Sequence, residues 1–219
     1  MEGTMQIYFV RHSETQWNAL GRLQGESDVP LSEQGKKLAD ITGAALENVP
    51  FDIAYVSPYI RARQTAAHLL RRRQIPVFED ERIREITWGK WDGLTAKEIE
   101  KMGKKEEYQL FYTDPFRFQG APDGETIRQV CQRGREFLDD LTGRKDLSES
   151  TVLVVTHGCA VRGILNHLYE DPKNFWQEGV PPNCAVTVVE AKGETLKIIE
   201  KDQIFYDPSQ IRNHYVPEP

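Results

Sequence analysis

Four side chains that could bind or attack an anion stand at or shortly after the ends of three apolar segments. The apolar segments are residues 7–10, 53–56 and 152–155. The four side chains are those of Arg11, His12, Arg61 and His157. In open α/β sheets, ligands bind outside the carboxyl ends of the strands. If the three segments are neighbouring strands, the two imidazoles and two guanidinium groups meet at one edge of the sheet.

This combination of side chains is suited to phosphoryl transfer. Arginine is permanently charged and its planar fork matches phosphate oxygens, so two arginines make a strong anion pocket. A neutral imidazole nitrogen can attack phosphorus and hold the phosphoryl group covalently, while a second imidazole donates to the equatorial oxygens. A carboxyl group is still needed to protonate the leaving oxygen and later activate water. Glu85 is the candidate, because the nearby Trp88 and Trp91 could raise its pKa by excluding water.

Two other chemistries are weaker interpretations of these residues. Paired histidines suggest a metal centre, but neither H-x-H nor H-E-x-x-H occurs, and the charge of Arg11 beside His12 opposes a bound dication. Cys159 lies two residues after His157 and could be a thiol nucleophile; a buried packing thiol at a helix start is the favoured interpretation. The remaining histidines are assigned no role: His68, His167 and His214.

Further apolar runs predict an α/β fold around these positions. Residues 185–189 are predicted to form a fourth strand that pairs with 196–199 through a turn at 192–194. Apolar residues at helical spacing predict helices in four segments: 38–45, 62–70, 127–141 and 161–168. Alternating strands and helices are typical of an α/β domain.

Polar residues mark where several helices begin. Ser32 is the expected N-cap of the first helix, and Ser57 followed by Pro58 is expected to open the second. Thr95 and Glu98 have the spacing of a capping box and predict another helix start.

The region from about 95 to 125 is expected to be an insertion within a single domain spanning residues 1–219. After a charged stretch it carries a group of aromatic residues: Tyr108, Phe111, Tyr112, Phe116 and Phe118. The favoured interpretation of these aromatics is a satellite core, and the alternative is a lid over the substrate.

Composition limits the classes of partner. The chain has 219 residues with 28 Lys+Arg and 34 Asp+Glu, a net charge of −6, and this acidic balance disfavours binding to nucleic acid. It contains no apolar stretch long enough to cross a membrane. Three widely spaced cysteines without a C-x-x-C motif, and a start without signal-peptide features, predict reduced thiols and a cytoplasmic location. The expected partner is a small phosphorylated metabolite, with neither nucleic acid nor membrane.

The segment from Arg11 to Asn18, RHSETQWN, resembles the signature of the histidine phosphatase superfamily, the phosphoglycerate-mutase-like proteins. Further blocks match in the family's order: 21–25, 28–32, 35, 57–58, 61–66, 85, 89, 91–93, 123–126 and 155–158. Together they span most of the chain and are highly specific. The resemblance implies a three-layer α/β/α sandwich on a mostly parallel sheet.

The resemblance also implies a role for each matching residue. His12 would be the phosphorylated nucleophile, with Arg11, Arg61 and His157 completing the phosphate pocket. Glu85 would be the proton donor and later the base. The residues expected to contact the phosphoryl group or the substrate also include Asn18, Gln24, Gly25 and Gly158. Asn18 could instead cap its own loop. The family uses no metal, and no cofactor is implied.

One residue departs from the family pattern. Ser13 stands where the family usually has glycine, which permits close backbone approach and unusual dihedral angles. Serine is the smallest polar replacement, so we expect a slightly altered pocket that still functions. If the position required a positive φ, Ser13 would store backbone strain.

Within the family the main division is between hydrolysis and phosphate relocation. Gln24-Gly25, the segment 183–187 and the short middle insertion resemble the phosphatase branch. We therefore expect a phosphomonoesterase, with a cofactor-dependent phosphoglycerate mutase as the alternative and a non-catalytic phosphate-binding module as a third hypothesis. The aromatic insertion favours a broad enzyme that prefers apolar or aromatic esters. A homodimer is expected from the family resemblance.

Overall fold

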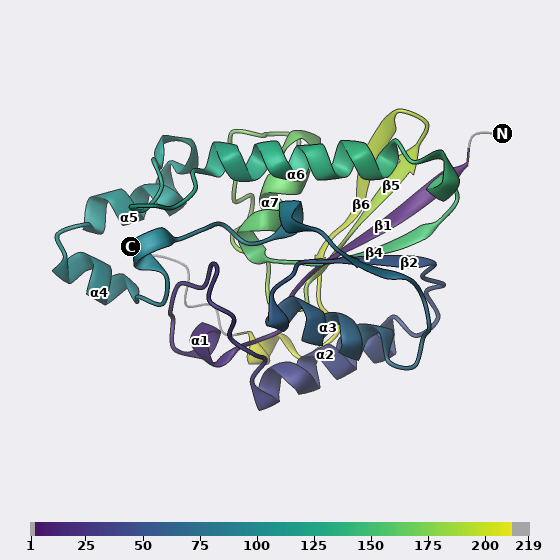
Figure 1. The fold of residues 1–219 in the computed structure, drawn as a ribbon, viewed down its shortest axis with the longest axis horizontal. Helices are drawn as coiled ribbons and strands as arrows, with labels where there is room; N and C mark the ends of the chain where they lie inside the picture. The colour runs from purple at the N-terminus through teal and green to yellow at the C-terminus, as the bar shows by residue number, and fades with distance from the viewer. Residues whose placement is uncertain (1–2, 212–219) are drawn as a thin grey trace.

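The computed structural model describes residues 3–211, and its centre is a six-stranded sheet (Figure 1). The strands are β1 (Thr4–Arg11), β2 (Ile53–Val56), β3 (Val77–Glu79), β4 (Thr151–Thr156), β5 (Val186–Lys192) and β6 (Thr195–Gln203). Their order is β3-β2-β4-β1-β5-β6. The first four in that order are parallel, and β5 and β6 add antiparallel strands at one edge. The predicted mostly parallel sheet is confirmed.

Helices cover both faces of this sheet. The α-helices are α1 (Gln16–Ala19), α2 (Glu33–Ala45), α3 (Ile60–Leu70), α4 (Ala96–Lys101), α5 (Lys105–Thr113), α6 (Ile127–Thr142) and α7 (Gly158–Leu165). Short 3₁₀ turns occupy Glu81–Ile83, Gly89–Trp91, Pro115–Arg117, Lys145–Leu147, Asn166–Leu168 and Pro208–Gln210. Figure 1 shows α6 and α7 on one side of the sheet and α2 and α3 on the other, so the predicted three-layer arrangement is confirmed.

The central strands are apolar throughout because both of their faces are covered. In β4, Val152 and Val154 pack in the core beneath α6 and α7, whereas Leu153 and Val155 pack in the core against α3. All four side chains are fully buried. The four predicted strands and the hairpin between β5 and β6 are confirmed. The edge strand β3 was not predicted, because its three residues are exposed and too few to show a pattern.

The predicted helix starts are confirmed at two positions and wrong at a third. Ser32 accepts the backbone N–H of Gly35 as the N-cap of α2, and Thr95 with Glu98 forms the capping box of α4. The predicted capping role of Ser57 is wrong, because α3 begins after Tyr59 without a side-chain cap. Ser57 instead turns its hydroxyl toward His157.

The strand register brings the predicted site together. Arg11 at the end of β1 pairs with Thr156 at the end of β4, and Val155 pairs with Val56 at the end of β2. The residues that follow these three strands therefore meet at one edge. The helices α4 and α5 of the predicted insertion lie beyond this edge (Figure 1). No helix within residues 3–211 combines the length and apolarity needed to span a membrane.

Candidate active site

A cavity opens at the carboxyl edge of the sheet and receives most of the predicted site residues. Those that line it are Arg11, His12, Asn18, Gln24, Glu85 and Gly158. Arg61, His157 and Gly25 do not line the cavity, but Arg61 donates hydrogen bonds to both of the other two residues. The imidazole rings of His12 and His157 have centroids 5.0 Å apart. The expected convergence of the two histidines is therefore present.

His12 is held as a neutral imidazole with a fixed tautomer. Its Nδ1 lies 2.7 Å from the carbonyl oxygen of Ser13, which can only accept, so Nδ1 carries the proton. The other nitrogen, Nε2, is thereby left with its lone pair. Burial, together with the charges of Arg61 and Arg11, lowers the pKa of His12 well below its usual value. A neutral, buried imidazole of this kind is a competent nucleophile.

Ser13 fits the loop without backbone strain. It is absent from the described residues with positive φ, so the conditional expectation of strain does not apply. Its N–H donates to Thr65 Oγ1 at 2.9 Å, and its hydroxyl donates to the carbonyl of Gly35 at 2.6 Å. A Cβ at Gly35 would lie 2.0 Å from the carbonyl oxygen of Glu14. The serine therefore links the His12 loop to α2, and the first turn of α2 must lie close to that loop.

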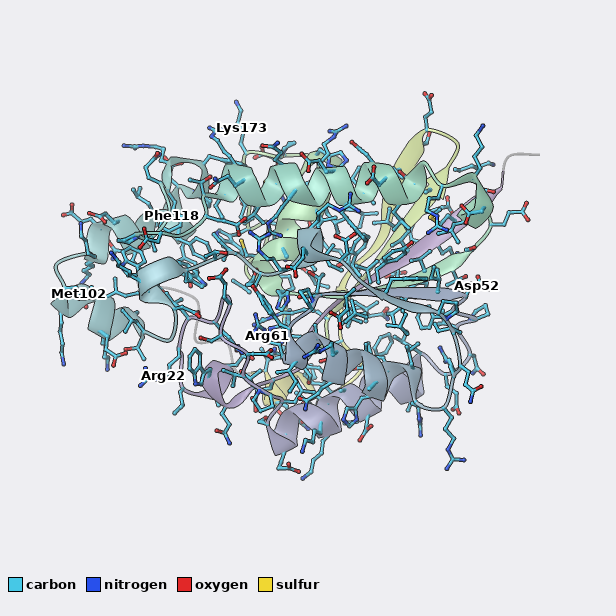
Figure 2. The ribbon with its side chains drawn as sticks, viewed as in Figure 1. Arg22, Asp52, Arg61, Met102, Phe118 and Lys173 are labelled. Atoms are coloured by element: carbon cyan, nitrogen blue, oxygen red, sulfur yellow. The ribbon has the colours of Figure 1, made fainter. Side chains whose placement is uncertain are left out.

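Arg61 is fully buried in the interior of the molecule (Figure 2). Its Nη1 donates to the carbonyl of Ser27 at 2.9 Å and its Nη2 to the carbonyl of Gly25 at 2.7 Å. Burial lowers the pKa of Arg61 to about 10, with Glu85 opposing that shift, so the guanidinium remains charged at neutral pH. Gly25 takes part in this arrangement through its backbone: its carbonyl accepts from Arg61, and its N–H donates to Asp92 Oδ1.

The contacts of Arg61 also fix the tautomer of His157. Arg61 Nε donates to His157 Nδ1 at 3.1 Å, so that nitrogen accepts and the proton lies on Nε2. His157 Nε2 then donates to Ser57 Oγ at 2.7 Å. Burial, followed by the charge of Arg61, lowers the pKa of His157 well below its usual value. His157 is therefore a neutral donor whose N–H is engaged by Ser57.

Glu85 is seated on the N-terminus of α7. Its Oε1 accepts the backbone N–H groups of Ala160 and of Ile86, both at 3.0 Å, and its Oε2 accepts that of Cys159 at 3.2 Å. Helix N-termini favour negative charge, so these contacts stabilise the carboxylate. The predicted apolar surroundings are present in part: Trp88 lines the same cavity, but the polar backbone groups form the seat itself.

The other cavity residues supply donors and space. Arg11 donates through Nη1 to the carbonyl of Pro181. A Cβ at Gly158 would lie 3.3 Å from Arg11 Nε, so the glycine leaves room for this guanidinium. Asn18 Oδ1 accepts the N–H of Thr15 as part of the capping box of α1, so the capping alternative for Asn18 is present. Gln24 is buried, and its Nε2 has no hydrogen-bond partner within residues 3–211, which leaves a donor for a bound anion.

Aromatic side chains line part of the same cavity. They are Trp88, Phe111, Tyr112 and Trp176. Of the predicted aromatic group, Phe111 and Tyr112 therefore reach the cavity. Tyr108, Phe116 and Phe118 do not line it, but they belong to or pack against the same apolar cluster as Phe111. Trp176 was not predicted, because it lies in a loop without periodic pattern; its Nε1 donates to the carbonyl of Phe111 at 2.7 Å.

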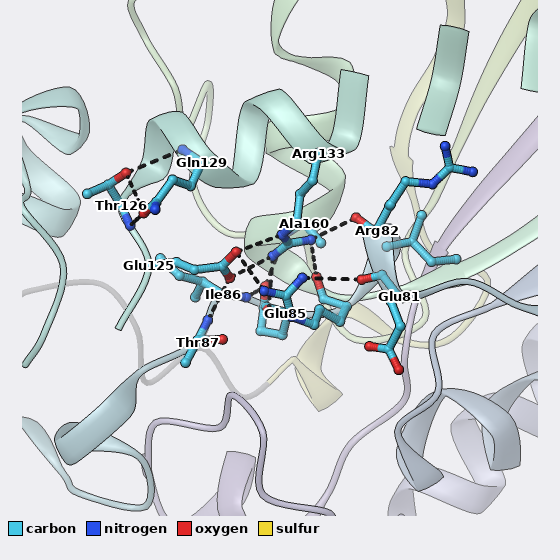
Figure 3. A network of polar contacts seen from close by, with 12 residues as sticks. Glu81, Arg82, Glu85, Ile86, Thr87, Glu125, Thr126, Gln129, Arg133 and Ala160 are labelled. Atoms are coloured by element: carbon cyan, nitrogen blue, oxygen red, sulfur yellow. Dashed lines mark hydrogen bonds and ion pairs between the residues drawn. The ribbon is translucent and has the colours of Figure 1, made fainter. Parts of the chain in front are cut away.

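Two charged residues behind the Glu85 loop were also missed. Arg133 and Glu125 form an ion pair with Nε to Oε1 at 3.0 Å, shown at the centre of Figure 3. A signal for Arg133 exists in the sequence: it stands between Val130 and Phe137 on the apolar stripe of α6. A charged residue on a buried stripe requires a polar partner.

Two features of the structure bear on the alternative chemistries, a thiol nucleophile and a metal centre. Burial raises the pKa of the Cys159 thiol well above its usual value, which disfavours a thiolate nucleophile. Among residues 3–211, no group of three or more His, Cys, Asp or Glu side chains is arranged to hold a metal ion. Of the three histidines without an assigned role, His68 pairs with Asp40 on the surface, and His167 lies in the 3₁₀ turn Asn166–Leu168. The third, His214, lies outside the described residues.

Known proteins are similar to this chain over most of its length. The sequence profile of the histidine phosphatase superfamily (branch 1) matches residues 7–202. Phosphoserine phosphatase 1 of Hydrogenobacter thermophilus is 34% identical over 189 residues, which cover 84% of this chain and 86% of that protein. A 2,3-bisphosphoglycerate-dependent phosphoglycerate mutase of Cytophaga hutchinsonii is 30% identical over 167 residues, 74% of this chain and 76% of the mutase. The solved structure of YhfR from Bacillus stearothermophilus has a TM-score of 0.84 at 33% identity and covers 91% of this chain and 98% of YhfR.

Proposed function

Because this chain belongs to the histidine phosphatase superfamily (branch 1), we propose that His12 is the residue that carries the phosphoryl group of its substrate. The enzyme is a phosphomonoesterase that works through a phosphohistidine. The observation that carries the assignment to His12 is its fixed tautomer. With Nδ1 bonded to the Ser13 carbonyl, Nε2 keeps its lone pair in a cavity that also contains Arg11 and Glu85.

In the first step, His12 Nε2 attacks phosphorus and the bond between phosphorus and the ester oxygen breaks. The leaving oxygen takes a proton from Glu85 and departs as the alcohol. Arg11 and the amide of Gln24 bind the phosphoryl oxygens. The ring of His157 lies 5.0 Å from that of His12, between centroids, so His157 is the neighbour of a phosphoryl group on His12. A charged phosphoryl oxygen is a stronger acceptor than the Ser57 hydroxyl and competes with it for the Nε2–H of His157. The charge of Arg61, which donates to His157, stabilises the phosphoryl group electrostatically.

In the second step, water attacks the phosphorus of phospho-His12. Glu85, now a carboxylate, accepts the water proton, and the phosphorus–nitrogen bond breaks to release phosphate and neutral His12. The backbone N–H groups at the start of α7 stabilise the carboxylate that this step needs.

The pH dependence of the rate follows from these two groups. His12 must be neutral, and because its pKa is lowered well below the usual value, activity should persist into mildly acidic solution and fall only at lower pH. Glu85 must carry a proton in the first step, so kcat/KM should fall as the solution becomes alkaline. We expect an optimum at mildly acidic to neutral pH, measured as kcat/KM across the pH range. A rate still rising at strongly alkaline pH contradicts the role of Glu85.

The cavity wall supports a preference for apolar or aromatic leaving groups. Trp88, Phe111, Tyr112 and Trp176 line the cavity, and Arg11 is the one Lys or Arg among the described residues that do so. Burying apolar surface of the leaving group against this wall makes binding more favourable. A polar sugar bound there would lose hydrogen bonds to water, which makes its binding less favourable.

A substrate panel tests this preference. We expect aryl and alkyl phosphates to be hydrolysed with higher kcat/KM than sugar phosphates, phosphoserine or 3-phosphoglycerate. Trp176→Ala should reduce the advantage of the aryl esters about tenfold, the order of effect for an apolar pocket contact. As a control, Phe116→Ala removes an aromatic side chain of the same apolar cluster that does not line the cavity. A sugar phosphate far better than every aryl phosphate contradicts the assignment.

Phosphoglycerate mutase activity is the second candidate, favoured by the 30% identity to the Cytophaga enzyme. A mutase passes the phosphoryl group from the enzyme to a second hydroxyl and must retain a bisphosphorylated intermediate, which requires further cationic groups around the cavity. The apolar wall favours hydrolysis. Assays with 3-phosphoglycerate, with and without 2,3-bisphosphoglycerate, separate the two: isomerisation without phosphate release contradicts the phosphatase.

We further propose that the enzyme is cytoplasmic and acts on a small phosphorylated metabolite, without nucleic acid or membrane as partner. The three free cysteines and the acidic composition support this location and substrate class. A homodimer is proposed from the family, and sedimentation of the purified protein tests it.

A further inference from the structure

The Arg133 side chain uses all five of its N–H donors on one short segment and one carboxylate. Its Nη1 donates to the carbonyls of Arg82 and Arg84 at 2.8 and 2.7 Å, and its Nη2 to the carbonyl of Glu85 at 3.1 Å. The remaining N–H groups on Nε and Nη2 donate to the two oxygens of Glu125. The guanidinium thus binds the backbone that carries the proposed general acid (Figure 3).

Glu125 holds the same segment from its other end. Its Oε2 accepts the backbone N–H of Thr87 at 3.0 Å, and its Oε1 also accepts from Arg84 Nη2 at 2.8 Å. Burial acts to raise the pKa of Glu125, but the hydrogen bonds and charge of Arg133 outweigh it and lower the pKa. Glu125 is therefore a charged partner, and a partly buried ion pair holds residues 82–87.

Both ends of Glu85 are anchored to the same pair of packed helices. Its backbone carbonyl is held by Arg133 on α6, and its carboxylate is held by the N–H groups of Cys159 and Ala160 on α7. The helices approach closely: a Cβ at Gly134 of α6 would lie 2.8 Å from the Cα of Ile164 on α7. A close-packed contact of this kind resists displacement. The carboxyl position is thereby set by α6 and α7 together.

We propose that Arg133 and Glu125 act as positioning residues for the general acid, holding the Glu85 carboxyl where it can protonate the leaving oxygen. This inference rests on the proposed function of Glu85. It separates the pair from residues that build the phosphate pocket, because neither Arg133 nor Glu125 lines the cavity. Their contribution is therefore assigned to proton transfer.

This division of roles predicts a dependence on the leaving group. An alkoxide is a poor leaving group and must be protonated as it departs, whereas 2,4-dinitrophenolate is stable without a proton. A displaced acid therefore slows the cleavage of alkyl phosphates and spares 2,4-dinitrophenyl phosphate. The quantity to compare is kcat/KM. It reports the steps up to and including the first phosphoryl transfer when that transfer is irreversible.

The experiment uses Arg133→Lys and Glu125→Gln in the full chain, with phenylethyl phosphate and 2,4-dinitrophenyl phosphate as probes. Lysine keeps the charge but cannot span four acceptor groups, and glutamine keeps the shape but loses the charge. We expect kcat/KM for the alkyl ester to fall about 100-fold, the effect of a small misplacement of a catalytic group, and that for the dinitrophenyl ester to change less than about threefold. Glu85→Gln should show the same selectivity.

The matched control is Arg135→Lys, two residues along α6, where the side chain is exposed and pairs with Asp139. It should change neither ester. Equal losses with both esters in the Arg133 and Glu125 variants overturn the proposal, because a general loss of folded protein or of the phosphate pocket has that signature. Unchanged activity with both esters also overturns it. If Glu85→Gln itself shows no selectivity while residue 12 is still phosphorylated, the acid assignment falls and the phosphohistidine stands.

Discussion

Replacing His12 with alanine is expected to reduce turnover of every phosphomonoester by at least about 10⁴-fold, because the reaction loses its nucleophile and not a mere contact. The ring is positioned by its hydrogen bond to the Ser13 carbonyl, and no neighbouring group can replace Nε2. The ring of His157 is 5.0 Å away between centroids, but its Nδ1 accepts from Arg61 and its Nε2 carries the proton. The measurement is phosphate release from a good substrate by the purified variant.

The fold of the His12→Ala variant should survive, although the reason differs from the one that the sequence suggests. A residue at a strand end is expected to lie outside the core, yet His12 is only 3% exposed. Its ring lines the cavity, so water can fill the space left by alanine. As a control, His68→Ala removes a surface histidine paired with Asp40 and should retain full activity. Substantial turnover by folded His12→Ala contradicts the mechanism.

The second large effect is expected for Arg61→Ala, which should weaken both binding and rate. We expect kcat/KM to fall by roughly 10³-fold, since one buried cation both stabilises the phosphoryl charge and fixes the tautomer of His157. Inorganic phosphate should also become a weaker competitive inhibitor. The carbonyls of Gly25 and Ser27 lose their donor, so the free energy of unfolding should fall by about 2–4 kcal/mol.

Arg63→Ala is the matched control for Arg61. It lies two residues along α3, is about half exposed, and pairs with Glu79 at 3.4 Å on the surface. We expect wild-type kinetics and a change in unfolding free energy below about 1 kcal/mol. Arg61→Lys separates charge from geometry, because lysine keeps the charge but cannot bond to His157 and both carbonyls. Near wild-type activity of Arg61→Ala would mean that this guanidinium is structural.

Much of the architecture could be predicted because strands that are buried on both faces of the sheet form uninterrupted apolar runs in the sequence. The run at 152–155 is uniformly apolar since alternate side chains enter two different cores, and the same holds for the run at 7–10. The convergence of His12 and His157 then followed from the general placement of ligands at the carboxyl ends of parallel strands.

What could not be predicted depends on pairings between residues distant in sequence. Ser57 has the sequence pattern of a helix cap. Its hydroxyl reaches His157 only because β2 pairs with β4. Arg61 donates to His157 Nδ1 and to the carbonyls of Ser27 and Gly25, and no local pattern around Arg61 predicts these contacts. The aromatic wall draws on Trp176, which no local pattern places beside Phe111.

The central claim is that Nε2 of His12 carries the phosphoryl group between the two steps. Rapid mixing with an aryl phosphate, alkaline quenching to preserve the phosphorus–nitrogen bond, digestion and mass analysis test it directly. We predict a phosphorylated peptide that contains residue 12, that forms before phosphate is released, and that is absent from His12→Ala. Phosphate release with no phosphorylated peptide at any time, or phosphorylation of a peptide lacking residue 12, contradicts the claim.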